Sequence, residues 1–548
     1  MARRTGRDVL LEVLASEGVV HIFGNPGTTE LPLMDALVDR DDFHYVLAMQ
    51  EATVVAMADG YAQATGRPAF VNVHTMAGLG NAIGNLTNAV ANRTPLVVTA
   101  GNADRRLLIA DPLLSGDLVK LAQGVSKWGH EVRHPEELGT VLRRAFNDAA
   151  TAPGGPVFVA LPQDLVDQEC DGPVPPKSEV ERRTIGTGLD RLAALLTAPA
   201  PGKLAIVAGE EVASSGAMDE LVAVAERLGA PVFTSPLASL RVFPPAHPLS
   251  AGGLNPRADA IRGALTGYER IFLVGNHAFL VYPYAPGSPL PDDADLVQLA
   301  PDPYALGRTH PVRLGVAGDP RVTLGALLPM LPESQAAGSA LEAAKTARAA
   351  QIASFEETAL GRYDASPMHP MAAVHATLRA LPPDITVVDE GITAGAYVRG
   401  LHLSERAGSY FFCRGGGLGW GMPAACGISL ARGGEPVLCI VGDGSAMYSP
   451  QALWTAAHEQ LPVVFAVVNN RQYLILKQNL QLLKGKFAET GRSVGMDLDR
   501  PPVDFVSLAR SMGVDATFVD RAADVGDAVR AAHASGKPHL LELPVSPV

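Results

Sequence analysis

The chain has 548 residues, which exceeds what one hydrophobic core holds and predicts about three domains. Hydrophobic residues make up 47% and aromatic residues only 5%, a balance that is typical of an α/β enzyme and excludes a disordered or fibrous protein. The formal net charge of −13 is dispersed without a basic stripe, so nucleic acid is excluded as an expected partner.

The cysteine pattern and the N-terminus both indicate a cytoplasmic protein. The four cysteines have no CxxC spacing and lie in apolar runs, which favours buried thiols over disulfides or a zinc site. Arginines precede an apolar stretch at the N-terminus, but Glu12 interrupts that stretch and no small-residue cleavage site follows. No run approaches the length of a membrane span, so we expect no membrane partner.

Residues 1–170 carry short β-branched runs that end in glycine-rich turns and lead into helical patterns. This alternation is typical of a parallel sheet built from βαβ units. Residues 171–187 are rich in proline and charge, have no hydrophobic period and predict a linker. The strands predicted before this linker are Val19–Phe23, Tyr45–Ala48, Pro68–Val73, Pro95–Ala100 and Pro156–Leu161.

Residues 188–335 predict a second α/β domain, with buried strands in LAIVAGEEV, PVFTSP, RIFLVGN and DLVQLAP. The first of these strands lacks the GxGxxG phosphate turn, so we expect a Rossmann-like middle domain that holds no FAD. An Ala/Glu-rich segment in residues 336–367 predicts a connecting helix. Residues 368–548 show the same pattern as the first domain, with short apolar strands followed by glycine-rich turns. This pattern predicts two related outer domains around the middle one.

The strongest chemical signal lies in the third domain, where two apolar strands end in polar residues. The strand Val437–Val441 is followed by GDGS, and the strand Val463–Val468 is followed by NN. Because parallel strands end at one shared edge where ligands bind, Asp443 and Asn470 are expected to face each other there. With a main-chain carbonyl such as that of Gln472, they form a hard oxygen set that suits Mg²⁺ sharing phosphate oxygens. The GDGS tetrapeptide alone is equally typical of a turn between a strand and a helix.

The GDG…NN pair resembles the signature of thiamin diphosphate enzymes, and this resemblance extends over the whole chain. It implies that the third domain binds the cofactor's diphosphate through Mg²⁺, with Ca²⁺ as an alternative metal. The stretches FGNPGTTELP and LAMQEATVVAMADGYAQATG resemble the pyrimidine-binding domain of the same superfamily. The resemblance further implies cofactor contacts at Asn25, Thr393, Gly444, Ser445, Tyr448 and Asn470.

Glu51 is the critical residue of the first domain. It lies where a strand ends and an apolar helix begins, so its carboxyl is expected to be partly desolvated and easily kept protonated. A glutamate favoured only by the helix dipole is the plain alternative. In the superfamily, such a carboxyl donates to the pyrimidine N1′ of the cofactor and so starts removal of the thiazolium C2 proton.

The stretch RGGGLGWGMP surrounds one apolar residue, Leu418, with glycines and has no helical or strand period. An ordinary glycine-rich loop is the alternative interpretation. The resemblance implies that Leu418 wedges between the two cofactor rings and that the Gly416 carbonyl binds the 4′-nitrogen.

Within the superfamily, the stretches GNPGTTELP, SYFFCRGGGLGWGMPAA and GDGSAMYSPQALWTAA are similar to the benzoylformate decarboxylase family. His74 falls where that family carries a catalytic histidine, and imidazole exchanges protons near neutral pH. Thr28 stands in place of the family's active-site serine and, with Asn25, is expected near the substrate carboxylate. Tyr282 aligns with the family's second histidine, although His277 lies five residues earlier, so the identity of this group stays open.

These residues predict non-oxidative decarboxylation of a benzoylformate-like 2-oxo acid to an aldehyde and CO₂, with carboligation as a side activity. An acetolactate synthase-type carboligase is an alternative, against which His74 argues. A flavin-dependent oxidase and a non-catalytic cofactor-binding relative are further alternatives, and the retained Glu51 counts against the latter. The superfamily also implies that the first domain of one subunit and the third of another enclose the cofactor. We therefore expect at least a homodimer, and the family favours a tetramer built as a dimer of dimers.

Overall fold

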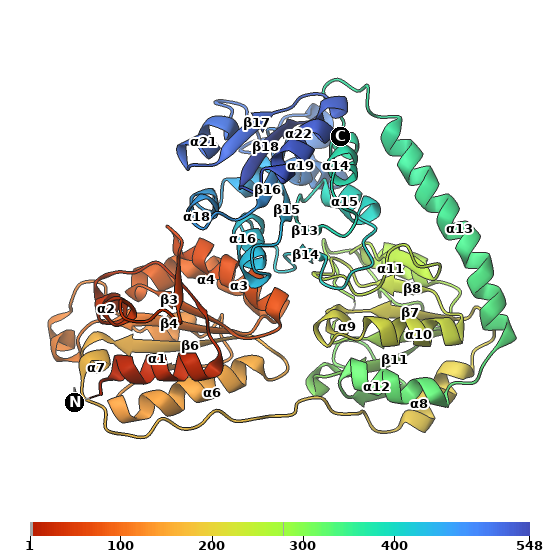
Figure 1. The fold of residues 1–548 in the computed structure, drawn as a ribbon. Helices are drawn as coiled ribbons and strands as arrows, with labels where there is room; N and C mark the ends of the chain where they lie inside the picture. The colour runs from red at the N-terminus through yellow and green to blue at the C-terminus, as the bar shows by residue number, and fades with distance from the viewer. Residues whose placement is uncertain (1–3, 278) are drawn as a thin grey trace.

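The structure is a computed structural model, which describes residues 4–277 and 279–548. It contains three six-stranded sheets, each wholly parallel and flanked by helices (Figure 1). The strands of these sheets lie in residues 21–162, 204–317 and 386–544. The predicted α/β fold of three parallel-sheet domains is therefore confirmed.

The first sheet has the strand order β2-β1-β3-β4-β6-β5. β3, β4 and β6 are buried along their whole length, as expected for central strands covered on both faces. The sequence did not predict β5, because its three residues GHE form no apolar run. The strands are β1 (His21–Gly24), β2 (His44–Leu47), β3 (Ala69–Val73), β4 (Leu96–Asn102), β5 (Gly129–Glu131) and β6 (Pro156–Pro162). The helices are α1 (Gly6–Glu17), η1 (Thr28–Glu30), α2 (Leu31–Leu37), α3 (Glu51–Thr65), α4 (Thr75–Asn92), η2 (Arg105–Ala110), α5 (Leu118–Ala122), η3 (Pro135–Glu137), α6 (Leu138–Ala150) and α7 (Gln163–Asp167).

The second sheet has the order β12-β11-β10-β7-β8-β9, so the chain leaves the central β7 in both directions, as in a doubly wound Rossmann-like domain. The run LAIVAGEEV is not extended throughout, because β7 ends at Ala208 and α9 begins at Glu210. Acidic residues at a helix start are favoured by the helix dipole. The strands are β7 (Leu204–Ala208), β8 (Val232–Thr234), β9 (Ser250–Gly253), β10 (Arg270–Val274), β11 (Asp295–Ala300) and β12 (Leu314–Ala317). The helices are α8 (Leu189–Thr197), α9 (Glu210–Ser214), α10 (Met218–Leu228), α11 (Ala258–Leu265), η4 (Pro303–Ala305), α12 (Pro320–Leu327) and η5 (Leu328–Met330).

The third sheet has the order β14-β13-β15-β16-β18-β17, and its central strands β15 and β16 are almost entirely buried. The strands are β13 (Thr386–Glu390), β14 (Tyr410–Phe412), β15 (Val437–Gly442), β16 (Val463–Asn469), β17 (Asp515–Phe518) and β18 (His539–Pro544). The helices are α14 (Pro370–Arg379), α15 (Gly395–Leu401), α16 (Gly421–Ala431), α17 (Asp443–Ala446), α18 (Ala452–His458), α19 (Leu474–Leu482), α20 (Lys486–Thr490), α21 (Phe505–Ser511) and α22 (Ala522–Ala534).

Two segments connect the three sheets along the outside of the molecule. Residues 171–187 carry no helix or strand and run from the first domain to the second (Figure 1). The helix α13 (Gln335–Leu360) then leads from the second domain toward the third and buries only Ala337 and Ala359. Among the described residues, no helix combines the length and the apolar character that crossing a membrane requires.

The first and third domains pack directly on each other through α3 and α16. A Cβ on Gly60 of α3 would overlap the backbone of Ala424, and a Cβ on Gly427 of α16 would overlap the carbonyl oxygen of Met57. The absence of side chains at these two glycines allows the helices to approach closely. Because α3 begins at Glu51, this packing fixes the predicted catalytic carboxyl relative to the third domain.

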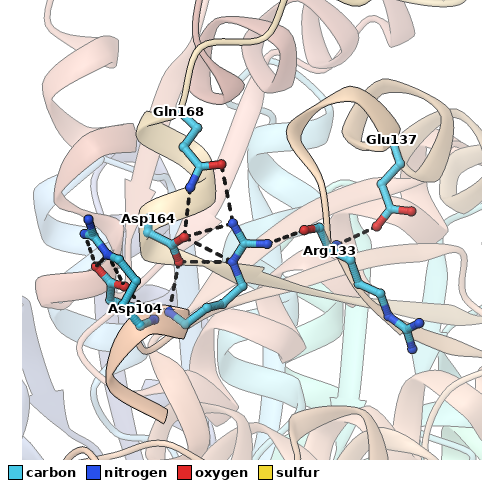
Figure 2. Close-up of polar contacts among 7 residues, drawn as sticks. Asp104, Arg133, Glu137, Asp164 and Gln168 are labelled. Atoms are coloured by element: carbon cyan, nitrogen blue, oxygen red, sulfur yellow. Dashed lines mark hydrogen bonds and ion pairs between the residues drawn. The ribbon is translucent and has the colours of Figure 1, made fainter. Parts of the chain in front are cut away.

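An exposed apolar segment, η2, is held firmly after β4. Arg105 pairs with Asp164 at 2.8 Å through Nη2 and donates its backbone N–H to the same carboxylate at 3.0 Å. Gln168 donates to Asp164 at 3.0 Å, as Figure 2 shows, and the neighbouring Asp104 caps η2 by accepting from the Arg106 N–H. These contacts order a segment whose apolar side chains are left exposed, among them Leu107, Leu108 and Ile109.

Candidate functional site

The carboxyl edge of the third sheet carries a small cavity, which we call the edge cavity. It has a volume of about 60 Å³ and lies where β13, β15 and β16 end. The structure thus brings together most of the residues that the sequence assigned to the metal and the diphosphate, whereas Tyr448 is 56% exposed outside the cavity. Gly416, assigned to the 4′-nitrogen, does not line the cavity either. The lining comprises Gly391, Ile392, Thr393, Ala394, Leu418, Gly442, Asp443, Gly444, Ser445, Val468, Asn470, Gln472, Tyr473, Leu474 and Ile475.

Asp443 is the buried acid of the edge cavity. Burial raises the pKa of its carboxyl to about 6, while hydrogen bonds from the backbone N–H groups of Gly444, Arg471 and Gln472 oppose that rise. Asn470 lies beside it, and its Oδ1 accepts from the Gln472 N–H at 3.1 Å. Among the described residues, no group of three or more His, Cys, Asp or Glu side chains is placed to hold a metal. A single buried carboxylate beside an amide oxygen and glycine backbone fits Mg²⁺ shared with a diphosphate.

Glu51 lies in the first domain as the first residue of α3, and it is only 7% exposed. Its Oε1 accepts from Asn25 Nδ2 at 3.2 Å, and its Oε2 accepts from Asn81 Nδ2 at 2.9 Å. A Cβ on Gly78 would lie 3.0 Å from Oε1, so a side chain at this position would crowd the Glu51 carboxyl. Glu51 is therefore buried, and Asn81 is a partner that the sequence did not reveal.

His74 follows β3 and is the N-cap residue of α4, as the sequence predicted for a strand-end histidine. Its Nδ1 lies 2.8 Å from Glu30 Oε2 and 3.1 Å from Thr29 Oγ1. A Cβ on Gly27 would overlap the imidazole, so this glycine lets the NPG turn lie against the ring. Thr28, in the same turn, is exposed.

Glu30 is a site residue that sequence reasoning missed. It is 3% exposed, and besides His74 it accepts from the backbone N–H groups of Gly27 at 3.0 Å and Gly101 at 2.9 Å. These contacts hold the carboxylate in one orientation, and through it the Nδ1 side of the imidazole. The GTTELP stretch contains this glutamate, but only the fold brings it to a histidine 44 residues away.

The two candidates for a second proton donor differ in accessibility. Tyr282 is 65% exposed and its backbone N–H donates to the Pro256 carbonyl at 2.8 Å. His277 is half-buried, and burial together with Arg93 and Arg414 lowers its pKa. No hydrogen bond in the described part of the chain joins either residue to His74.

The glycine loop, residues 414–420, is held from two sides. Glu390, at the end of β13, accepts from the backbone N–H groups of Gly419 at 2.7 Å, Trp420 at 3.0 Å and Gly421 at 2.8 Å. Asn88 of α4 donates to the Gly417 carbonyl at 2.9 Å and accepts from its N–H at 3.0 Å. The loop that carries Leu418 to the edge cavity is therefore fixed by the first and the third domain together.

Replacing Glu390 by glutamine is expected to flatten the pH dependence of the free energy of unfolding. Burial raises the pKa of Glu390 to about 7 from an ordinary 4.5, so the folded chain keeps a proton that the unfolded chain releases. The resulting stabilisation is fully present below the unfolded pKa and is lost as the pH rises through about 7, roughly 3 kcal/mol in total. Denaturant unfolding of both cofactor-free proteins across this pH window measures the difference, and parallel pH profiles would contradict it.

Family models of thiamine pyrophosphate enzymes match three stretches of the chain. The N-terminal thiamine pyrophosphate binding domain matches residues 4–114, the central domain residues 189–327 and the C-terminal binding domain residues 394–543. The chain belongs to the thiamine pyrophosphate enzyme family. Thiamine pyrophosphate is another name for thiamin diphosphate, so the resemblance drawn from the GDG…NN pair and the Glu51 stretch is confirmed.

Relatives within the thiamine pyrophosphate enzyme family match along nearly the whole chain. The benzoylformate decarboxylase of Pseudomonas aeruginosa is 33% identical over 100% of this chain and 99% of its own. The acetolactate synthase isozyme 3 large subunit of Escherichia coli is 28% identical over 94% of this chain and 89% of its own. Among solved structures, the benzoylformate decarboxylase of Polynucleobacter necessarius is 29% identical with a TM-score of 0.89, covering 100% and 99% of the two chains.

Glu51 with its side-chain partners and the edge cavity share no residue. The side-chain partners of Glu51, Asn25 and Asn81, both belong to the first domain. The residues that line the edge cavity all lie in the third domain. Asp443 and Glu51 therefore belong to two distinct clusters, each with part of the predicted set.

Proposed function

We propose that the protein is a Mg²⁺-dependent decarboxylase that converts an aryl or related 2-oxo acid into an aldehyde and CO₂ without oxidation. The observation that carries this proposal is His74, whose Nδ1 is held by the buried Glu30 in the same domain as Glu51. A histidine oriented in this way is suited to moving protons near neutral pH. The 33% identity with the benzoylformate decarboxylase of Pseudomonas aeruginosa, which spans the whole chain, supports the same reaction.

The third domain would hold the cofactor's diphosphate end. Asp443, Asn470 and the Gln472 carbonyl would bind Mg²⁺, since hard oxygen ligands suit this ion. When bound, thiamin diphosphate supplies a nucleophilic thiazolium carbon and accepts the electrons released as CO₂ leaves. The residues assigned to the diphosphate are Thr393, Gly444, Ser445 and Tyr448, and those assigned to the two rings are the Gly416 carbonyl and the Leu418 side chain.

The first domain would supply the side chains that hold and transfer protons. Glu51 would hold a proton at the pyrimidine N1′, and Asn25 and Asn81 keep its carboxyl in place for that contact. His74 would give a proton to the carbon that loses CO₂, while Thr28 and Asn25 would bind the substrate carboxylate. Tyr282 is the candidate for the second donor because its phenol is exposed, whereas the His277 ring is half-buried.

A second copy of the chain would bring the Glu51 cluster and the edge cavity around one cofactor. The η2 segment and the residues just after it support such an assembly, because Leu107 and Ile109 of η2 and the following Leu113 are 53%, 96% and 88% exposed, and η2 is anchored by the ion pairs of Arg105 and Arg106. Exposed apolar side chains gathered on an ordered segment are typical of a protein interface. A homodimer, and a tetramer made of two such dimers, is the assembly that we propose.

Replacing Ile109 and Leu113 together by aspartate is expected to dissociate the dimer into monomers. Two buried charges without partners cost an interface several kcal/mol, roughly a hundredfold or more in dissociation constant. Analytical ultracentrifugation measures the change, and the apparent affinity for thiamin diphosphate should fall with it. Val180→Asp, at an exposed position of residues 171–187, is the control and should leave the assembly intact. If the variant stays dimeric, η2 is not part of the interface.

The reaction is tested by supplying the protein, reconstituted with Mg²⁺ and thiamin diphosphate, with a panel of aliphatic and aromatic 2-oxo acids. Mass spectrometry follows CO₂ and the carbon product. Aldehyde alone supports the proposal. A hydroxyketone as the main product would favour the second candidate, an acetolactate synthase-type carboligase. The match to the Escherichia coli enzyme supports that candidate. Absence of turnover with every acid would indicate a non-catalytic cofactor-binding relative.

A further inference from the structure

The glycine loop contacts the middle domain through its first residue. The Arg414 guanidinium donates from Nη1 to Glu210 Oε2 at 2.7 Å and from Nη2 to the His277 carbonyl at 3.0 Å. Both partners of the ion pair have side chains only 10% exposed. The Arg414 backbone N–H donates to Asn92 Oδ1 of the first domain at 3.1 Å. All three domains therefore meet at Arg414.

The neighbouring glutamate of the middle domain makes a matching contact with the first domain. Glu211 Oε1 lies 2.9 Å from Arg93 Nη1, and the same carboxylate accepts from the Asn276 side chain at 2.6 Å and from its backbone N–H at 3.0 Å. Arg93 is the C-cap residue of α4, the helix whose other end follows His74. Two consecutive glutamates at the start of α9 thus hold one arginine from each cofactor domain, in surroundings where salt screens little.

The far end of the glycine loop reaches the edge cavity, where Leu418 is part of the lining. Three glycines separate it from Arg414, and Gly416 has a φ of 73°, a conformation that glycine adopts at little cost. Gly415 and Gly417 lie close against Asn88, where an added Cβ would overlap its Oδ1, but the glycines contribute no side chains of their own, so the polar anchors of the loop add to this contact. On the middle-domain side, Arg414 and Gly415 border a cavity of about 410 Å³, which means that close packing does not substitute for the ion pair there.

We propose that Glu210 and Arg414 are a positioning pair through which the middle domain fixes the place of Leu418 in the edge cavity. Neither side chain lines that cavity, so both act through the loop and not on the reacting atoms. Loss of either partner leaves a buried charge unpaired and removes the loop's contact with the middle domain, so that Asn88 and Glu390, which hold Gly417 and Gly419 on either side of Leu418, must position it alone. The effect on turnover rests on the proposed function, whereas the effect on the loop does not.

The test uses the full chain with and without Mg²⁺ and thiamin diphosphate. The variants are Arg414→Met, Glu210→Gln, the double variant Arg414→Met/Glu210→Met and the conservative Arg414→Lys. Hydrogen–deuterium exchange of the peptide that contains residues 414–420 reports the loop directly. The matched control is Arg321→Met, which removes an Arg–Glu pair of 3.1 Å to Glu220 on the outside of the same domain.

In the first three variants, the loop amides are expected to exchange about tenfold faster than in the wild type. The double variant regains the melting temperature that the single variants lose, because it leaves no buried charge unpaired, yet its loop still exchanges fast. With the best 2-oxo acid, kcat falls about tenfold or more while KM stays within twofold, and the circular dichroism of the bound cofactor changes. Arg414→Lys, which keeps the charge opposite Glu210, restores most of kcat, and Arg321→Met changes none of these quantities.

Wild-type loop exchange and wild-type kcat in the double variant would overturn the proposal, because the pair would then serve stability alone. If Arg414→Met does not fold, Glu210→Gln serves as the test variant, because glutamine has almost the same size and shape as glutamate. If the wild type turns over no 2-oxo acid, the proposed function fails. The exchange measurements on the cofactor-free chain still decide whether the pair positions the loop.

Discussion

Asp443→Ala is expected to abolish Mg²⁺-dependent binding of thiamin diphosphate. Asp443 is the acidic side chain of the edge cavity, and the Asn470 oxygen and the Gln472 carbonyl are neutral ligands that bind a hard divalent cation weakly without it. If Asp443 holds the metal as proposed, loss of its carboxylate removes the charge that would retain both the ion and the diphosphate. Isothermal titration calorimetry should show an affinity reduced by more than about 100-fold.

The same replacement should leave the cofactor-free protein folded. Burial raises the pKa of Asp443 to about 6, so the carboxylate is already costly to bury and its removal is not expected to lower the melting temperature. Asp527→Ala, at an exposed ion pair with Arg530 on α22, is the control and should bind the cofactor normally. Undiminished binding by Asp443→Ala would show that the metal is held elsewhere.

Glu51→Gln is the second replacement with a large expected effect, because it keeps the shape of the side chain and removes only its titratable proton. Proton transfer by a positioned side chain contributes roughly 10²- to 10⁴-fold to a rate, and kcat should fall by that factor. Asn25 and Asn81 both donate to the carboxylate, so one of the two amides must reorient toward glutamine. Binding of Mg²⁺ and the diphosphate at Asp443 should persist, since the two clusters share no residue.

Steady-state kinetics with the best 2-oxo acid measures the loss, and calorimetry verifies that the variant still binds thiamin diphosphate. Glu226→Gln, on the surface of α10 beside His247, serves as the control for an uncharged replacement of glutamate. Turnover of Glu51→Gln at the wild-type rate would show that another group activates the cofactor.

Local patterns predicted the sheets well because a parallel strand is a short apolar run with a glycine turn after it. The runs before Asp443 and Asn470 appear as β15 and β16, and both residues line one cavity. The same rule missed five strands at the edges of the sheets, β5, β9, β12, β14 and β17, which have only three or four residues each. The rule also made the first strand of the middle domain too long. The apolar run LAIVA does not indicate that a helix begins at Glu210.

The sequence by itself determined the fold class and the family, and it located Asp443, Asn470, Glu51 and His74 at strand and helix ends, because these features depend on residues close together in the chain. Only the tertiary structure decided what holds these side chains. Glu30 reaches His74 across 44 residues, Glu210 reaches Arg414 across 204, and Asn88 reaches Gly417 across 329. Such pairs leave no periodic trace in a single sequence, since the folding of the first domain brings Glu30 to His74 and the packing of separate domains brings the other two pairs together. The residues that line the edge cavity could therefore be located from strand ends in the sequence, whereas the contacts that support them could not.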